Sequence, residues 1–188
     1  MFKTLIQKAV RSRSNTVFNR IKPYINKNEK LLDIGSGSGD VSFVLKQNDY
    51  NVTPLDVVDF HGPRLIETTI YDGKNIPFAN NSFDKALLLM VMHHTPDPEL
   101  ILNEGLRVAK ELIVIETSYV TKFERFYTIV TDTIGNLRFD AFWNSYKTDY
   151  EWKQLFNAKN LTVSDTHIFH DHNLGFPQLH ISYHLIRK

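Results

Sequence analysis

The segment from Leu31 to Leu45 constrains the fold most, because a short apolar run passes through a glycine turn into a helical pattern. The run Leu31–Ile34 is followed by Gly-Ser-Gly-Ser-Gly-Asp, and apolar residues then recur at helical spacing. Glycines at alternate positions let the backbone bend tightly and approach a ligand without an intervening Cβ. The segment therefore predicts a ligand-binding loop in an α/β fold, although G-x-G-x-G differs from the G-x-G-x-x-G of dinucleotide folds.

Predicted strands and helices alternate along the chain. Runs rich in apolar and β-branched residues predict strands at 31–34, 52–58, 65–71, 83–92, 112–115, 161–169 and 179–186. A helical pattern over residues 98–110 separates the fourth run from the fifth. Because this alternation is typical of α/β proteins, we predict a single Rossmann-like, doubly wound sheet of about seven strands. We expect it to be mostly parallel, with an antiparallel last strand.

The connection after the second strand is unusually short. Only 13 residues separate Asp56 from Ile70, and Gly62-Pro63 interrupts them. A parallel crossover normally needs about a dozen residues besides the strand ends. We therefore expect a loop or a single turn in place of the helix after strand two.

Composition excludes several classes of protein. The chain of 188 residues has no cysteine, which excludes disulfide scaffolds, thiolate zinc sites, iron–sulfur clusters and cysteine nucleophiles. No apolar run approaches the roughly 18 residues that a membrane span needs. We therefore expect a cytoplasmic protein without a transmembrane segment.

The first 30 residues carry most of the positive charge. They hold eight basic residues against one acid, a net +7, whereas the remainder is −6 and the whole chain is +1. Two apolar stripes, at Phe2–Val10 and Val17–Ile25, predict two helices, with Ser14 or Asn15 as the N-cap of the second. Three interpretations of these helices are open: they pack on a core, they meet an acidic partner or a membrane, or they form a transit peptide. A secretory signal does not fit, because no continuous apolar region follows the basic start.

An acidic residue stands where the second predicted strand ends. Asp56 lies 17 residues beyond Gly39. A carboxylate at this place can accept both hydroxyls of a ribose, which suits an adenosine cofactor. It disfavours NADP, because the 2′-phosphate would be repelled.

Further short motifs follow in a fixed order. They are Asp72-Gly73, Ile76-Pro77-Phe78, Ser82-Phe83-Asp84, His93-His94-Thr95, Glu104 and Arg107-Val108. Together with the glycine turn and Asp56, their order and spacing over residues 31–116 resemble the class I S-adenosylmethionine-dependent methyltransferases. The resemblance is to the small type 11 group, which includes enzymes similar to those of ubiquinone and menaquinone biosynthesis.

The resemblance implies S-adenosyl-L-methionine as cofactor and a set of residues that would bind it. The loop from Asp33 to Gly39 would hold the methionine part, Asp56 the ribose hydroxyls and Val57 the adenine. Asp72 would meet the adenine amino group, and Met90 would line the sulfonium side. The implied cofactor-binding residues are Asp33, Gly35, Ser36, Gly37, Gly39, Asp56, Val57, Asp72, Gly73 and Met90.

Catalytic and acceptor residues are less constrained. His94 stands at the carboxyl end of a central predicted strand, where its imidazole either takes a proton from the acceptor or supports the loop. Residues 117–152 hold ten of the 23 aromatic residues and form core, a dimer interface or a lid over an acceptor pocket. The aromatic residues that we expect to contact the acceptor are Tyr119, Phe142, Trp143 and Tyr146.

A run of histidines near the C-terminus raises the question of a metal. His167, His170 and His172 form an H-x-x-H-x-H pattern. On a strand, His170 and His172 share a face and His167 lies opposite. No carboxylate-rich motif supports them, so we expect no metal site.

We predict one methyltransferase domain over residues 1–188. It comprises N-terminal helices (1–30), a cofactor-binding half (31–116), an aromatic lid or insert (117–152), and a closing helix and strands (153–188). Thr148 is the expected N-cap of the closing helix, with Glu151 completing a capping box.

The expected reaction is direct, in-line methyl transfer to a small, partly apolar acceptor. The alternatives are an RNA- or protein-directed methyltransferase that uses the basic N-terminal arm, and a non-catalytic methyltransferase-like module. A nucleic-acid acceptor is not favoured, because no Asn-Pro-Pro-Tyr motif follows strand four. A nicotinamide oxidoreductase would need a third glycine at x-x-G spacing and a substrate domain, and the sequence has neither.

Overall fold

The protein was analysed as a computed structural model that describes residues 2–59, 66–136, 143–173 and 175–188. Side chains are described except at residues 2–11, 135, 136, 143 and 173 within that range. The chain divides into two compact units: unit 1 comprises residues 1–89 and 104–113, and unit 2 comprises residues 90–103 and 114–188. The organisation of residues 1–188 as a single domain stays a prediction.

Unit 1 is built on parallel strands with a continuously apolar core. Its elements are α1 (Phe2–Ile21), a short 3₁₀ helix (Lys22–Tyr24), β1 (Lys30–Ile34), α2 (Asp40–Gln47), β2 (Asn51–Asp56), β3 (Thr69–Ile70) and β4 (Phe83–Leu89). Strand β1 pairs in parallel with both β2 and β4, and β2 pairs in parallel with β3. The core side chains Leu31, Leu32, Leu55, Leu87 and Leu88 are fully buried, as strands covered on both faces require.

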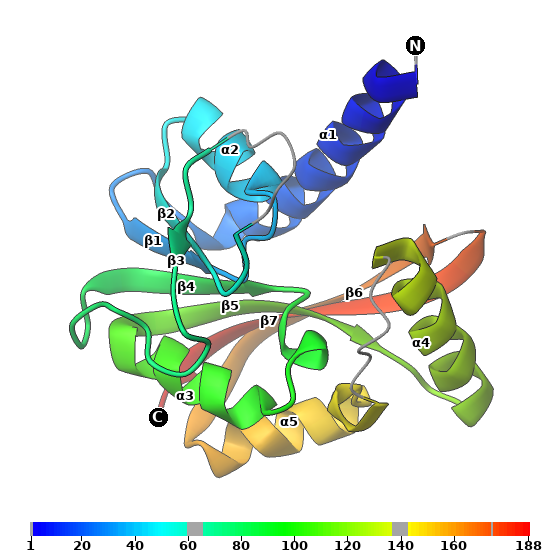
Figure 1. The fold of residues 1–188 in the computed structure, drawn as a ribbon. Helices are drawn as coiled ribbons and strands as arrows, with labels where there is room; N and C mark the ends of the chain where they lie inside the picture. The colour runs from blue at the N-terminus through cyan, green and yellow to red at the C-terminus, as the bar shows by residue number, and fades with distance from the viewer. Residues whose placement is uncertain (1, 60–65, 137–142, 174) are drawn as a thin grey trace. The chain divides into compact units, whose positions relative to one another are not determined.

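Helix α1 is continuous, so the prediction of two N-terminal helices separated near Ser14 or Asn15 is wrong. Serine and asparagine each disfavour a helix relative to alanine by well under 1 kcal/mol, and packing readily overrides so weak a preference. Phe18 supplies that packing, because its ring meets Tyr50 edge-on with 5.8 Å between ring centres. Helices α1 and α2 lie side by side in Figure 1.

The short connection after β2 agrees with the prediction. Strand β2 ends at Asp56, β3 comprises only Thr69–Ile70, and residues 57–59 and 66–68 form no helix. Gly62-Pro63 lies outside the described residues. Strand β3 is shorter than the predicted 65–71, and both of its residues are exposed, as is common for an edge strand.

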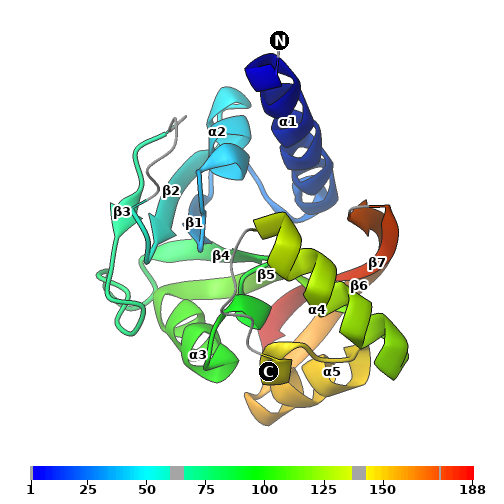
Figure 2. The ribbon, with the colours of Figure 1, turned by 45° about the vertical axis from the view of Figure 1, so that its right-hand side comes forward.

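Unit 2 is built around a long antiparallel hairpin. Its elements are a 3₁₀ helix (Met92–His94), α4 (Lys122–Asn136), a second 3₁₀ helix (Trp143–Ser145), α5 (Asp149–Ala158), β6 (Leu161–Asn173) and β7 (Phe176–Arg187). The hairpin pairs from Leu161 opposite Arg187 to Asn173 opposite Phe176. Figure 2 shows α4 and α5 against this hairpin. Helix α3 (Pro98–Val108) and strand β5 (Ala109–Ser118) each contain residues of both units.

The predicted capping box of α5 is present. The Thr148 hydroxyl accepts the backbone N–H of Glu151 at 3.3 Å, and the Glu151 carboxylate accepts the backbone N–H of Thr148 at 2.8 Å. The cap starts a helix whose Trp152 and Phe156 are fully buried. The Phe156 ring lies edge-on to Tyr183, with 5.1 Å between ring centres.

The strand order is β3-β2-β1-β4-β5-β7-β6 in one seven-stranded sheet. This order confirms the predicted fold class, a Rossmann-like α/β sheet that is mostly parallel and ends in an antiparallel hairpin. The chain moves outward from β1 in both directions, so β1 and β4 meet at the topological switch point. Open α/β sheets bind their ligands there, beyond the carboxyl ends of the strands. Among the described residues, no helix combines the length and the apolar character needed to span a bilayer.

Candidate active site

The glycine turn leaves β1 in a conformation that ordinary residues avoid. Gly35, Gly37 and Gly39 have φ angles of 74°, 56° and 78°, in the left-handed region that favours glycine. The N–H groups of Gly35 and Ser36 donate to the carbonyl of Leu55 at 2.8 and 3.0 Å. The turn is therefore tied to β2 before α2 begins at Asp40.

The glycines of the turn serve different purposes. A Cβ built on Gly39 would lie 2.3 Å from Cγ2 of Ile66, so packing requires glycine there. A Cβ built on Gly37 would meet no atom within 4 Å, so this glycine borders open space. The neighbouring Ser36 hydroxyl is buried and has no hydrogen-bond partner among the described residues. An open cradle beside an unsatisfied hydroxyl is the arrangement that a bound polar ligand would complete.

Asp33 is buried in β1 and links that strand to α2. Its side chain is 2% exposed, and Oδ2 accepts the Ser42 hydroxyl at 2.6 Å. Burial raises the pKa of Asp33 to about 6, although the Ser42 hydrogen bond opposes the shift. The structure thus places this predicted residue in a buried position against α2 rather than in solvent.

Asp56 ends β2 and holds the turn from the other side. One carboxylate oxygen accepts the backbone N–H of Gly37 at 2.6 Å, and the other accepts that of Val58 at 3.0 Å. A carboxylate has about four lone-pair positions, so two hydrogen bonds leave acceptor capacity for ribose hydroxyls. The prediction that Asp56 and the glycine turn form one site is consistent with this geometry.

The residues predicted to meet adenine lie next to Asp56. The Val57 side chain is 48% exposed, and a Cβ on Gly73 would lie 3.1 Å from its Cγ1. Gly73 therefore packs beneath an apolar side chain that is otherwise open. Asp72 is exposed and accepts the backbone N–H groups of Lys74 and Asn75 at 2.8 and 2.7 Å, which lowers its pKa. Its contact with an adenine amino group stays a prediction.

Met90 follows β4 and explains why that strand ends at Leu89 rather than at the predicted Met92. Its φ angle is +64°, which a β-strand cannot adopt and which is uncommon outside glycine. Its N–H donates to the carbonyl of Ile115 at 2.7 Å, which holds this conformation. Strained backbone of this kind often marks functional sites.

Unit 2 contains a buried polar cluster centred on His93. His93 is fully buried, and its Nδ1 makes a short contact with a carboxylate oxygen of Glu116. The other Glu116 oxygen accepts the N–H groups of Val91 and Met92 at 3.1 and 2.7 Å. Burial by itself would lower the pKa of His93, but the negative charges of Glu116 and Asp132 raise it to about 9.

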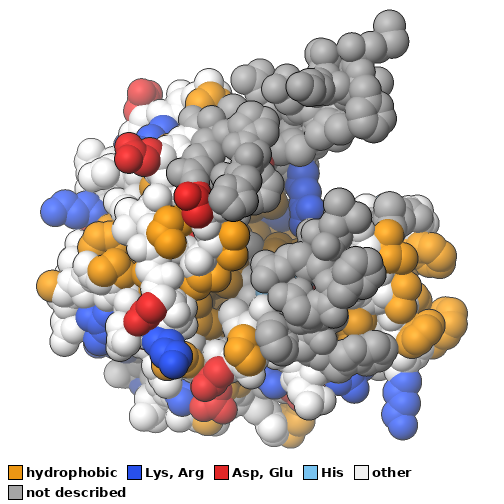
Figure 3. Space-filling model, in the orientation of Figure 1, with side chains coloured by type: hydrophobic (Ala, Val, Ile, Leu, Met, Phe, Trp, Pro, Cys, Tyr) orange, Lys and Arg blue, Asp and Glu red, His pale blue; other side chains and the backbone are white. Residues whose placement is uncertain are grey.

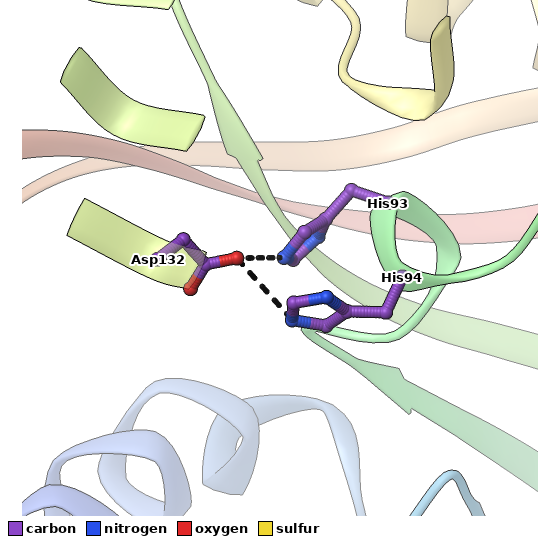
Figure 4. Close-up of side chains that lie close together, drawn as sticks. All are labelled: His93, His94 and Asp132. Atoms are coloured by element: carbon purple, nitrogen blue, oxygen red, sulfur yellow. Dashed lines mark ion pairs between the residues drawn. The ribbon is translucent and has the colours of Figure 1, made fainter. Parts of the chain in front are cut away.

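His94, the predicted catalytic residue, belongs to the same cluster. Its Nε2 lies 3.4 Å from Oδ2 of Asp132, and that oxygen also accepts the Tyr146 hydroxyl at 2.6 Å. The His94 side chain is 31% exposed, whereas Tyr146 is 3% exposed. Burial would raise the pKa of Asp132, but its contacts with both histidines and Tyr146 hold that pKa below its usual range. Figure 4 shows both imidazole rings turned towards Asp132.

The predicted acceptor residues have varied surroundings. Tyr146 is a member of the polar cluster, and one face of Tyr119 is covered by the Arg125 guanidinium, 5.6 Å from the ring centre. Phe142 lies outside the described residues, and Trp143 begins a 3₁₀ helix but its side chain is not described. An acceptor pocket lined by these four residues stays a prediction.

Much of the aromatic segment faces solvent. The side chains of Val120, Phe123 and Phe126 are 75%, 73% and 56% exposed. Hydrophobic side chains accordingly gather over α4 in the space-filling view (Figure 3). The segment therefore supplies an apolar surface as well as core.

Sequence reasoning missed two members of the cluster. Glu116 directly follows the apolar run Leu112–Ile115, so a carboxylate at the end of a buried strand was a usable signal. Asp132 lies in a segment that stood out for its aromatic residues, and no local pattern links it to His94. Among the described residues, the histidines of β6 form no group of three metal-ligand atoms; His167 instead lies 3.3 Å from Asp165.

The chain is similar in sequence to known proteins. The family model described as a methyltransferase domain matches residues 32–112. A ubiquinone/menaquinone biosynthesis C-methyltransferase of Rickettsia felis is 27% identical over 137 residues, 58% of this chain and 55% of the relative. The enzyme of the same name from Sinorhizobium fredii is 28% identical over 127 residues, 57% of this chain and 49% of the relative. The chain thus spans about half the length of these curated relatives.

Several solved structures with the same fold are methyltransferases by name. An S-adenosylmethionine-dependent methyltransferase of Methanosarcina mazei has a TM-score of 0.68 at 21% identity, covering 89% of this chain and 96% of that one. One from Thermotoga maritima has a TM-score of 0.68 at 16% identity, covering 100% and 97%. Residues 32–112 are thus similar to the methyltransferase domain family, and the chain shares the fold of these solved methyltransferases.

Proposed function

We propose that this chain transfers a methyl group from S-adenosyl-L-methionine to a small, partly apolar acceptor by direct displacement. The observation that carries the proposal is the glycine turn whose Gly37 N–H donates to Asp56 while the other side of Gly37 is open. A carboxylate with spare acceptor positions and the unsatisfied Ser36 hydroxyl thus lie beside one open cradle, which suits an adenosine cofactor.

The residues present fit this cofactor. The unsatisfied Ser36 hydroxyl and the open cradle at Gly37 suit the polar methionine part. The spare acceptor positions of Asp56 suit ribose hydroxyls, and the exposed face of Val57 suits an adenine ring. Asp72 is the residue that we expect to accept the adenine amino group.

The chain contributes positioning to the reaction. When bound, the cofactor would supply a sulfonium methyl group, whose carbon the acceptor's nucleophile would attack in line as the carbon–sulfur bond breaks and S-adenosylhomocysteine leaves. The turn and Asp56 restrain the cofactor, and such positioning contributes up to about 7–11 kcal/mol in favourable cases. Where the nucleophile carries a proton, the His94 imidazole is our candidate acceptor, because Asp132, 3.4 Å from its Nε2, would stabilise the resulting imidazolium.

Binding and turnover test the proposal separately. Calorimetry with S-adenosylhomocysteine should show one site per chain, whereas NAD should not bind. Transfer of a labelled methyl group to a panel of small phenols, quinols and amines then identifies the acceptor class. Binding of NAD but not of S-adenosylhomocysteine would overturn the cofactor assignment. Methylation confined to RNA, with salt-sensitive binding, would instead support the nucleic-acid alternative.

A further inference from the structure

Three potential metal ligands meet in unit 2. His93 and His94 lie on the 3₁₀ helix after β4, Asp132 lies on α4, and one ligand atom of each is within 4.8 Å of the others (Figure 4). We propose that these three side chains bind one divalent transition-metal ion, and that zinc is the best match. The proposal goes beyond methyl transfer and does not depend on it.

The distances fit a metal better than hydrogen bonds. Oδ2 of Asp132 lies 3.5 Å from Nε2 of His93 and 3.4 Å from Nε2 of His94. Hydrogen bonds between nitrogen and oxygen are typically about 2.7–3.2 Å long. Ligand atoms bound tetrahedrally at about 2.1 Å from a zinc ion are separated by about 3.4 Å. The two observed separations therefore match the edges of such a coordination shell.

His93 is oriented as a metal ligand would be. Its Nδ1 contacts Glu116, while its buried Nε2 has no hydrogen-bond partner among the described residues. Histidine ligands commonly donate one ring N–H to a carboxylate and bind the metal through the other nitrogen. Glu116 is itself held by the N–H groups of Val91 and Met92, so it can fix the ring in this orientation.

Charge balance favours a divalent ion. Glu116 is fully buried and the Asp132 side chain is 8% exposed, so both carboxylates need a nearby positive charge. A divalent ion supplies two positive charges and can contact all three ligand atoms at once.

The ligand set selects the metal. Two imidazoles and one carboxylate are typical of catalytic zinc sites, which keep a fourth position open. Mg²⁺ and Ca²⁺ prefer sets made only of oxygen. The part-exposed His94 marks the side from which solvent reaches the cluster, and the Tyr146 hydroxyl supports Asp132 at 2.6 Å.

The test is a zinc titration of the full chain after chelator treatment. Calorimetry should give one site for Zn²⁺ and none for Mg²⁺, and Co²⁺ should show the strong visible bands of tetrahedral coordination. His94→Ala and Asp132→Asn should each weaken zinc binding at least about tenfold. The matched control is His167→Ala, which removes an exposed histidine that also lies near an aspartate, Asp165 at 3.3 Å, and should bind as the wild type does.

Three results would overturn the proposal: no stoichiometric zinc site in the wild type, unchanged affinity in His94→Ala, or equal loss in His167→Ala. Thermal unfolding provides a second measurement, because zinc should raise the Tm of the wild type but not that of His94→Ala. If Asp132→Asn fails to fold, His94→Ala decides the question, since its side chain is part-exposed and the Tyr146–Asp132 hydrogen bond remains.

Discussion

The backbone N–H of Gly37 donates a 2.6 Å hydrogen bond to the carboxylate of Asp56, 19 residues along the chain. This bond joins the end of β1 to the end of β2, where the cofactor is expected. It makes the carboxylate both a support for the loop and a candidate ribose ligand. The two roles can be separated experimentally, because loop support affects the free energy of unfolding whereas ribose binding affects the affinity for the cofactor.

Gly37→Val should weaken binding of S-adenosylhomocysteine at least about tenfold, because its side chain would enter the open cradle. The φ angle of +56° is also unfavourable for valine and should lower the free energy of unfolding by about 1–3 kcal/mol. Gly175→Val is the matched control, since Gly175 has a φ angle of +83° and equally open surroundings at the hairpin turn. Calorimetry that gave equal affinities for the two variants would refute the placement of the cofactor.

Asp56→Ala should weaken S-adenosylhomocysteine binding by about 2–3 kcal/mol, because it removes an acceptor from two backbone N–H groups and from the ribose. Asp56→Asn should retain part of the affinity through its amide oxygen. Asp84→Ala is the control, because that carboxylate also accepts a backbone N–H, from Lys30 at 2.9 Å, but lies outside the proposed site. The role of Asp56 would be contradicted if both alanine variants bound equally well.

Asp33 should make stability depend on pH. Its folded pKa of about 6 lies above the ordinary 3.8, so the folded protein binds this proton more tightly than the unfolded chain. Asp33 therefore favours folding below about pH 4, and this contribution is lost as the pH rises through about 6. The difference corresponds to about 3 kcal/mol.

Asp33→Asn tests this dependence, because asparagine cannot ionise. The free energy of unfolding of the variant minus that of the wild type, measured by urea unfolding, should be larger at pH 7.5 than at pH 4. Equal differences in the free energy of unfolding at both pH values would show that Asp33 does not titrate as its burial indicates.

Tyr146→Phe should lower the free energy of unfolding by about 1.5–3 kcal/mol, because buried Asp132 would lose a hydrogen bond to a charged oxygen. Tyr150→Phe, at a 69% exposed side chain on α5, should change it by less than about 0.5 kcal/mol. Urea unfolding of the two variants makes the comparison. Equal effects would mean that the hydroxyl of Tyr146 does not stabilise the cluster.

Local patterns predicted well where neighbouring residues determine the structure. The glycine turn, the helix that follows it and the Thr148 capping box depend on residues close in sequence, and all are present. The predicted helix break near Ser14 was wrong, because the packing of Phe18 against Tyr50 outweighs the weak preference of serine and asparagine against a helix. The end of β4 was predicted three residues late, because the positive φ of Met90 is held by the hydrogen bond that its N–H donates to the carbonyl of Ile115, far away in the sequence.

The sequence by itself determined the class of fold and the glycine turn after β1, because these depend on periodicity and on glycines at fixed spacing. The tertiary structure alone decided which polar groups meet away from that loop. Glu116 and Asp132 approach His93 and His94 from β5 and α4, and no periodicity encodes such contacts between distant segments. Burial makes those contacts matter for stability, because a charge removed from water is costly in free energy unless it has a partner.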